Sequence, residues 1–217
     1  MLRKETVAAD TLELLKRLMQ DEYLADFFLV GGTALSLQIG HRVSIDIDLF
    51  SRDPFDENEM LVYLESKRGL RLDYLSKNTI KGQIAETKID LIAHSYPLVK
   101  PLLVSEGIRL ASLEDIAAMK LNAIVGNGTR LKDFIDVAFL SGYLSLKTMM
   151  DAYEDKYASR NPLLTMKALN YRQDINFDEP VQLLNGRHSW KQVENRLTEM
   201  EKFPARVFET FPLPLKK

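Results

Sequence analysis

Two aspartates, Asp46 and Asp48, stand two residues apart in a segment, residues 44–49, where polar and apolar residues alternate. A two-residue period is typical of a strand with one buried face, so both carboxylates should project from the same side. Their Cα atoms would lie roughly 6.6 Å apart at about 3.3 Å per residue. The apolar residues would face the other way: Ile45, Ile47 and Leu49. Because like charges this close are unfavourable without a cation, the pair predicts a Mg²⁺ site for one ion or two.

A pair of glycines, Gly31 and Gly32, precedes the aspartates and follows the short apolar run at residues 27–30. Such a run suits an interior strand that ends at the glycines. Glycine leaves the backbone open to a ligand, and Thr33 would then open a helix whose free N–H groups favour an anion. We therefore predict a phosphate site at Gly31, Gly32 and Thr33. The structural alternatives are a tight turn for the glycines and a solvated strand edge for the aspartates.

A third carboxylate, Asp90, lies in another alternating segment, Lys88 to His94. On a strand next to the one that carries Asp46 and Asp48, it would lie about 5 Å to the side of them. There it could position an attacking hydroxyl or complete the coordination of a metal. The alternative is a solvated aspartate on an ordinary strand.

Gly-Gly-Thr, a short helix and Asp-x-Asp on the next strand together resemble the nucleotidyltransferase superfamily (DNA polymerase beta-like). The sequence GGTALSLQIGHRVSIDIDLF at residues 31–50 looks most like the AbiEii/AbiGii toxin family within it. The resemblance implies a Mg²⁺-dependent enzyme that moves a nucleoside monophosphate from a nucleoside triphosphate (NTP) to an acceptor hydroxyl. It further implies the toxin of a type IV toxin-antitoxin system, with a cognate antitoxin as partner and tRNA as one candidate acceptor.

Other functions stay open at this point. Within the enzyme class, the acceptor could be a small molecule of the aminoglycoside type. A second class is a module that binds nucleotide or metal without turnover. A third is an interaction protein whose acidic pair only faces solvent, and that class predicts no effect of Mg²⁺ on nucleotide affinity.

The segments MKLNAI and RLKDFIDVAFL, at residues 119–124 and 130–140, also look like the toxin family. By this resemblance Lys120 would bind the triphosphate, and Asp133 would orient the triphosphate or the lysine. The alternative is that both are solvated ion-pair partners on helix surfaces. The resemblance covers roughly residues 27–140.

The elements that must position these residues suggest an α+β fold: a nucleotidyltransferase-like mixed sheet with flanking helices, followed by a helical C-terminal half. We predict a core domain over residues 1–111 and a helical domain over 112–217, with the boundary near Ser112. The core should contain helices over 5–20 and 56–68, a hairpin of strands 70–76 and 80–87, and the strand 88–94. Helices should follow at 112–125, from 130 onward, and at 146–158, 162–171 and 190–203.

Composition sets outer limits on function. The 217 residues are 46% hydrophobic and 28% charged, as in ordinary globular proteins. With 29 basic and 31 acidic residues the net charge is −2, so an RNA contact needs a local basic patch. There is no cysteine, and hence no disulfide or thiolate chemistry. No secretory signal and no run near 18 apolar residues is present, so we expect a cytoplasmic protein that does not bind membranes.

Overall fold

The computed structural model describes residues 1–158, 161–184, 186 and 189–212. The chain divides into two compact units. The first unit comprises Met1–Pro97 and Pro101–Ala111, and the second comprises Leu98–Lys100 and Ser112–Lys217. Each unit has its own set of packed elements and is described separately.

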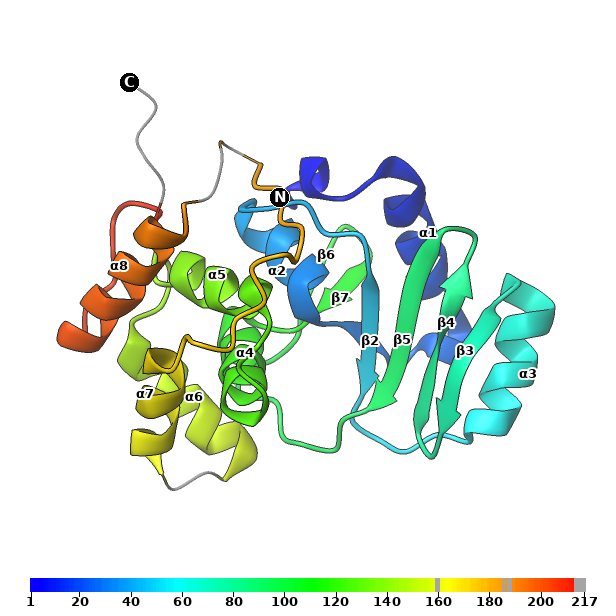
Figure 1. Cartoon of the computed structure of the whole chain (residues 1–217). Coiled ribbons are helices and arrows are strands. Elements are labelled where there is room, and N and C mark those ends of the chain that lie inside the picture. Colours follow the sequence, from blue (N-terminus) through cyan, green and yellow to red (C-terminus); the bar gives the residue numbers. More distant parts are fainter. Residues whose placement is uncertain (159–160, 185, 187–188, 213–217) are drawn as a thin grey trace. The chain divides into compact units, whose positions relative to one another are not determined.

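A seven-stranded sheet forms the first unit, with the strand order β3-β4-β5-β2-β1-β7-β6 (Figure 1). Its strands are β1 (Phe28–Leu29), β2 (Ile47–Ser51), β3 (Arg71–Ser76), β4 (Thr79–Ile84), β5 (Thr87–Ala93), β6 (Leu103–Ser105) and β7 (Ile108–Leu110). The pairs β2–β5 and β1–β7 are parallel, and the remaining pairs are antiparallel. The predicted mixed sheet is therefore confirmed.

One face of the central strands is buried, because alternate residues there are apolar. The side chains on this face are Ile47, Leu49, Ile80, Ile84, Ile89 and Leu91. Helix α3 (Glu57–Arg68) packs against β3 and β4, and α1 (Ala9–Met19) contacts β7. Asp56 caps α3 by accepting from the N–H groups of Asn58 and Glu59, and α3 ends at Gly69 with a φ of +68°, as its sequence predicted.

Two strand predictions need correction, and one pair of strands was missed. The strand that carries Asp48 begins at Ile47 rather than at Ser44, and β1 has two residues rather than four. The hairpin of β6 and β7 was not predicted at all. It matters for the core, since β7 pairs with β1 and its Arg109 donates to the carbonyls of Met19, Leu24 and Phe27. These three bonds fix the chain that enters β1.

The second unit is helical among its described residues. Its helices are α4 (Leu113–Gly126), α5 (Leu131–Leu140), α6 (Leu146–Tyr157), α7 (Pro162–Asn170) and α8 (Trp190–Lys202). All five begin within two residues of the predicted start, and the four helices with a predicted end also end within two residues of it. Ser112 caps α4 by accepting from the N–H of Asp115. Ser189 precedes α8, although its side chain makes no capping bond.

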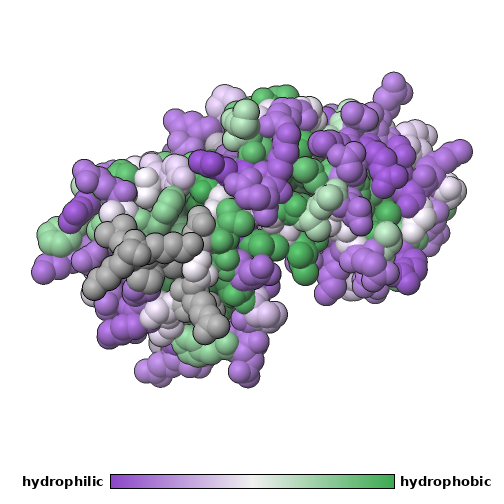
Figure 2. Space-filling view, turned by 90° about the horizontal axis from the view of Figure 1, so that it is seen from above, coloured by the Kyte–Doolittle hydropathy of each residue, from purple (hydrophilic) through white to green (hydrophobic). Residues whose placement is uncertain are grey.

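Hydrophilic residues cover most of the face seen in Figure 2. Within the described part of the chain, no helix combines the length and the apolar character needed to cross a membrane.

Candidate active site

Asp48 and Asp90 lie directly opposite each other on neighbouring parallel strands. The register of β2 and β5 pairs Asp48 with Asp90, between the buried pairs Ile47–Ile89 and Leu49–Leu91. Since paired residues on adjacent strands point to the same face, both carboxylates lie on the half-exposed side of the sheet. The expectation that Asp90 lies on the strand beside Asp48 is confirmed.

Asp46 is positioned by helix α2 (Gly31–Ile39) rather than by the strand ladder. The hydroxyl of Thr33, which is 1% exposed, donates to the main-chain carbonyl of Asp46 and contacts Ser44 Oγ at 2.9 Å. The chain before β2 therefore turns toward α2. This explains why Ile45, predicted to face the core, is instead 62% exposed.

The two glycines make room for two charged side chains. A Cβ atom on Gly31 would overlap Asp48 Oδ2 and lie 3.1 Å from its Cγ. A Cβ on Gly32 would overlap Arg42 Nη2 and lie 3.1 Å from its Cζ. Gly31 also has a φ of +69°, a conformation that favours glycine. The sequence argument held that these glycines open the backbone to a ligand; the structure adds that they let a carboxylate and a guanidinium approach the first turn of α2.

Arg42 is a site residue that the sequence analysis missed. Its side chain is buried, at 4% exposure, and its Nη1 donates to the carbonyl of Val43. A buried guanidinium beside a helix N-terminus adds a full positive charge to the partial charge of the free N–H groups. The available signal was its place in the sequence, since Arg42 stands between the glycines and the aspartates.

Lys81 is the second residue missed. It lies on β4 in register with Asp90, and its Nζ forms an ion pair with Asp90 Oδ2 at 2.5 Å. The side chain of Asp90 is 27% exposed, so Lys81 fixes it while solvent still reaches it. The predicted strand 80–87 contains Lys81, but its pairing with the strand that carries Asp90 was not predicted.

The residues present suit a hard divalent cation. Asp46 and Asp48 offer carboxylate oxygens, which are the ligands Mg²⁺ prefers, and the structure brings them beside a helix N-terminus suited to phosphate. Among the described residues, no three His, Asp or Glu side chains are close enough to hold an ion by themselves.

The second unit places Lys120 and Asp133 together. Lys120 Nζ lies 2.7 Å from Asp133 Oδ1 and 2.8 Å from Asp136 Oδ2. The three residues are 7%, 3% and 0% exposed, so the alternative of solvated surface ion pairs is wrong. The contact of Lys120 with a triphosphate stays a prediction, and so does the orienting role of Asp133.

Comparisons with known proteins identify the family of the chain. Residues 13–68 and 64–206 match the family model described as nucleotidyl transferase AbiEii toxin, type IV toxin-antitoxin system. The match extends past the residues 27–140 on which the resemblance rested. An uncharacterised protein of Aquifex aeolicus (strain VF5) is 33% identical over 169 residues, which cover 75% of this chain and 81% of that protein.

Two solved structures share the fold. JHP933 from Helicobacter pylori superposes with a TM-score of 0.53 and 20% identity over 92% of this chain and 93% of its own. The antibiotic-resistance factor ANT(2'')-Ia superposes with a TM-score of 0.53 and 16% identity over 76% of this chain and 100% of its own. Identities this low carry information on the fold alone, and they agree with the nucleotidyltransferase fold expected from the sequence.

Proposed function

Because the chain belongs to the AbiEii family of nucleotidyltransferase toxins, we propose that it uses Mg²⁺ to transfer a nucleoside monophosphate from an NTP to an acceptor hydroxyl. The observation that supports the proposal most is the register of Asp48 with Asp90 beside the first turn of α2. In this arrangement, carboxylates that suit a cation, N–H groups that suit phosphate and a further carboxylate that suits the acceptor lie on one side of the sheet.

The phosphates would bind at the start of α2. The N–H groups of Gly31, Gly32 and Thr33 belong to the first turn, where no intrahelical acceptor exists. The guanidinium of Arg42 lies against Gly32 and would hold an oxygen of the leaving pyrophosphate. Charge that develops on the pyrophosphate is thereby stabilised by donors that are already in place.

Asp46 and Asp48 would hold the Mg²⁺, whose chemistry when bound is to neutralise phosphate charge and align the reacting oxygens. Asp90 would orient the acceptor hydroxyl and accept its proton. The ion pair with Lys81 holds the Asp90 carboxylate on the side of the sheet that carries Asp48. Lys120, held by Asp133, is a proposed further ligand of the triphosphate.

The biological role proposed is that of a type IV toxin, with a cognate antitoxin as partner and tRNA as acceptor. The family description supports this role. The alternative acceptor, a small molecule of the aminoglycoside type, draws on the shared fold with an antibiotic-resistance factor.

Incubation of the pure protein with each labelled NTP, Mg²⁺ and total RNA tests the reaction directly. The wild type should label RNA with one or more NTPs, and chelation of the Mg²⁺ should stop it. Asp46→Asn and Asp48→Asn should each abolish transfer and leave the protein folded, since each change removes a carboxylate that the ion needs. Relief of like-charge repulsion should leave the melting temperature unchanged or higher.

Asp53→Asn is the matched control, because Asp53 is exposed in the loop after β2 and the change in charge is the same. It should keep full activity. If the Asp46→Asn/Asp48→Asn double variant still transfers nucleotide, or if Mg²⁺ fails to tighten NTP binding to the wild type, the proposed reaction is wrong.

A further inference from the structure

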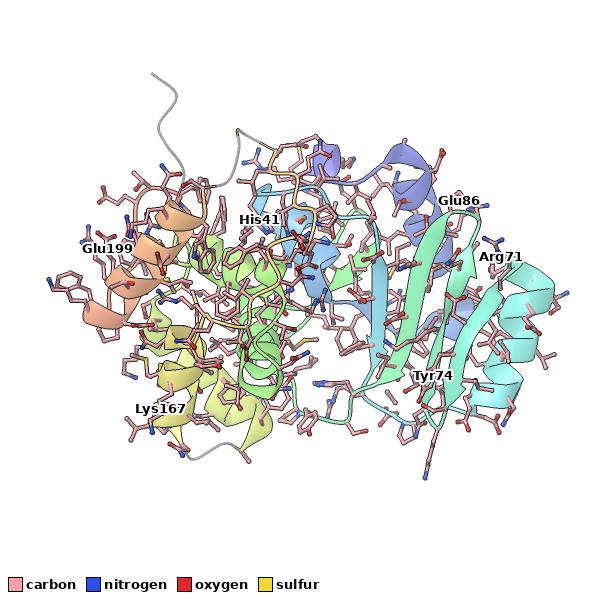
Figure 3. All side chains as sticks on the ribbon, viewed as in Figure 1. His41, Arg71, Tyr74, Glu86, Lys167 and Glu199 are labelled. Carbon is pink, nitrogen blue, oxygen red and sulfur yellow. The ribbon has the colours of Figure 1, made fainter. Side chains whose placement is uncertain are left out.

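One face of strands β3, β4, β5 and β2 carries polar side chains in two neighbouring rows, which we call the polar face. The first row is Tyr74, Lys81, Asp90 and Asp48, and the second is Arg71, Gln83 and Lys88. Each row is a series of register partners on successive strands, so its side chains share one side of the sheet. Arg71 and Tyr74, both on β3, are labelled in Figure 3.

A β-bulge in β3 brings an aromatic ring into the first row. Leu72 pairs with Gly82 and Tyr74 pairs with Lys81, so Asp73 is the extra residue of the bulge. Without the bulge, Asp73 rather than Tyr74 would stand opposite Lys81. The Tyr74 side chain is 53% exposed, which leaves its ring accessible to a flat partner.

The part of the polar face away from Asp48 is basic. Lys88 and Arg71 are exposed, and Arg71 Nη2 is held 3.2 Å from Gln83 Oε1 and 3.2 Å from the carbonyl of Ala85. Lys81 lies between them and the aspartates. The chain as a whole has a net charge of −2, so attraction for an anionic partner must come from a local cluster such as this one.

We infer that the polar face binds a single-stranded RNA acceptor next to its reacting hydroxyl. Arg71 and Lys88 contact phosphates, and Tyr74 stacks on a base. This combination of cations and an accessible aromatic ring is how proteins bind single strands. Tyr74 lies two strand spacings from Asp90, about 10 Å, within reach of the nucleotides that adjoin the hydroxyl.

The exposed cations disfavour the alternative acceptor on this part of the face. An aminoglycoside carries several ammonium groups, which Arg71 and Lys88 would repel, and exposed like charges nearby lower affinity rather than raise it. The inference rests on the proposed transferase reaction and specifies the acceptor class of the same site.

The test measures binding without turnover. In the Asp48→Asn background, a fluorescent single-stranded oligoribonucleotide is titrated by anisotropy at several salt concentrations. Arg71→Gln/Lys88→Gln should weaken binding about tenfold or more. The slope of the logarithm of the binding constant against the logarithm of the salt concentration (the salt slope) should fall in magnitude by about 0.7 for each lost phosphate contact. Tyr74→Ala should weaken binding about tenfold with the slope unchanged, because stacking releases no counterion.

The control is Arg17→Gln/Lys67→Gln, which removes two exposed positive charges from α1 and α3. It should bind like the parent protein. If it weakens binding as much as Arg71→Gln/Lys88→Gln does, or if Tyr74→Ala has no effect, the polar face is not the RNA site.

Transfer assays separate this inference from the proposed function. Wild type that labels tRNA, together with an Arg71→Gln/Lys88→Gln variant that labels it equally well, would overturn the RNA site and leave the transferase in place. Wild type that labels kanamycin and not tRNA would overturn the acceptor class alone. Wild type that transfers nucleotide to neither would count against the transferase itself.

Discussion

At the scale of single residues, the site depends on the absence of two side chains. Gly31 and Gly32 let Asp48 and Arg42 approach the helix start, and each glycine would clash with its neighbour if it carried a Cβ. The sequence singled out the two glycines, the two aspartates and the third acid as candidate site residues, because all of these belong to local patterns. It did not predict the roles of Arg42 or Lys81, because each depends on a contact with another element.

We expect Gly32→Ala to weaken NTP binding by about tenfold, or about 1.4 kcal/mol, while the protein stays folded. The new Cβ meets the far end of the Arg42 side chain, which can move, so stability changes little and the guanidinium is displaced from the phosphate site. Calorimetry with a non-hydrolysable NTP measures the affinity. Gly126→Ala, where a Cβ meets nothing within 4 Å, should bind like the wild type.

A double-mutant cycle identifies the cause of the loss. If Gly32→Ala acts through Arg42, the double variant should lose little more NTP affinity than Arg42→Ala loses alone. Fully additive losses would mean that the alanine blocks the phosphate directly. Unchanged affinity in Gly32→Ala would remove the phosphate-binding role of this turn.

At the scale of elements, the helix and the strand of the site are connected by one hydroxyl. Thr33 on α2 donates to the carbonyl of Asp46, which stands immediately before β2. We expect Thr33→Val to lower kcat at least tenfold with a smaller change in the KM for NTP, because Asp46 loses its fixed position. The unsatisfied carbonyl should also cost about 1–3 kcal/mol of stability.

Thr33→Ser keeps the hydroxyl and should restore most of the activity. Circular dichroism and urea titration check that Thr33→Val is folded under the assay conditions. Equal impairment of Thr33→Ser and Thr33→Val would show that the methyl group matters and the hydroxyl does not, contrary to this expectation.

Elements with strong local signals were predictable, and elements made by pairing were not. Helix α3 has a capping aspartate at its start and a glycine at its end, and its predicted bounds hold. Strand β2 starts later than the alternation indicates, because Thr33 takes the carbonyl of Asp46. Strands β6 and β7 have three residues each and join through Glu106 and Gly107, both with positive φ. Their apolar alternation is too short to be recognised without the partner β1.

At the scale of the whole molecule, one buried carboxylate explains why Leu98–Lys100 belongs to the second unit. Asp115, at the start of α4, accepts from the N–H groups of Val99 and Lys100 and from Ser112 Oγ. It also pairs with Lys156 on α6 at 2.9 Å. Burial alone would raise the pKa of Asp115, but the hydrogen bonds from Lys156, Ser112 and Val99 outweigh it and hold the pKa below its ordinary value.

A carboxyl group whose pKa is lowered in the folded state stabilises that state above its unfolded pKa. The stabilisation is lost as the pH falls through the folded pKa. The second unit should therefore lose stability as the pH falls below about 4, the ordinary range of an aspartate, because there the unfolded chain binds a proton more readily than the folded Asp115 does. Asp115→Asn removes the carboxylate that pairs with the buried Lys156, so we expect it to cost about 3–5 kcal/mol at neutral pH and to remove part of the acid-dependent loss.

The stability of the second unit can be followed through the fluorescence of Trp190. It is the single tryptophan of the chain and lies in α8 beside Phe134 and Phe177. Its fluorescence during urea unfolding, followed from neutral pH into the acid range, reports the stability. Asp151→Asn is the control, because Asp151 pairs with Lys147 on the exposed face of α6 and should cost less than about 1 kcal/mol. Equal losses in the two variants, or the same acid dependence in Asp115→Asn as in the wild type, would show that the Asp115–Lys156 pair does not stabilise the second unit.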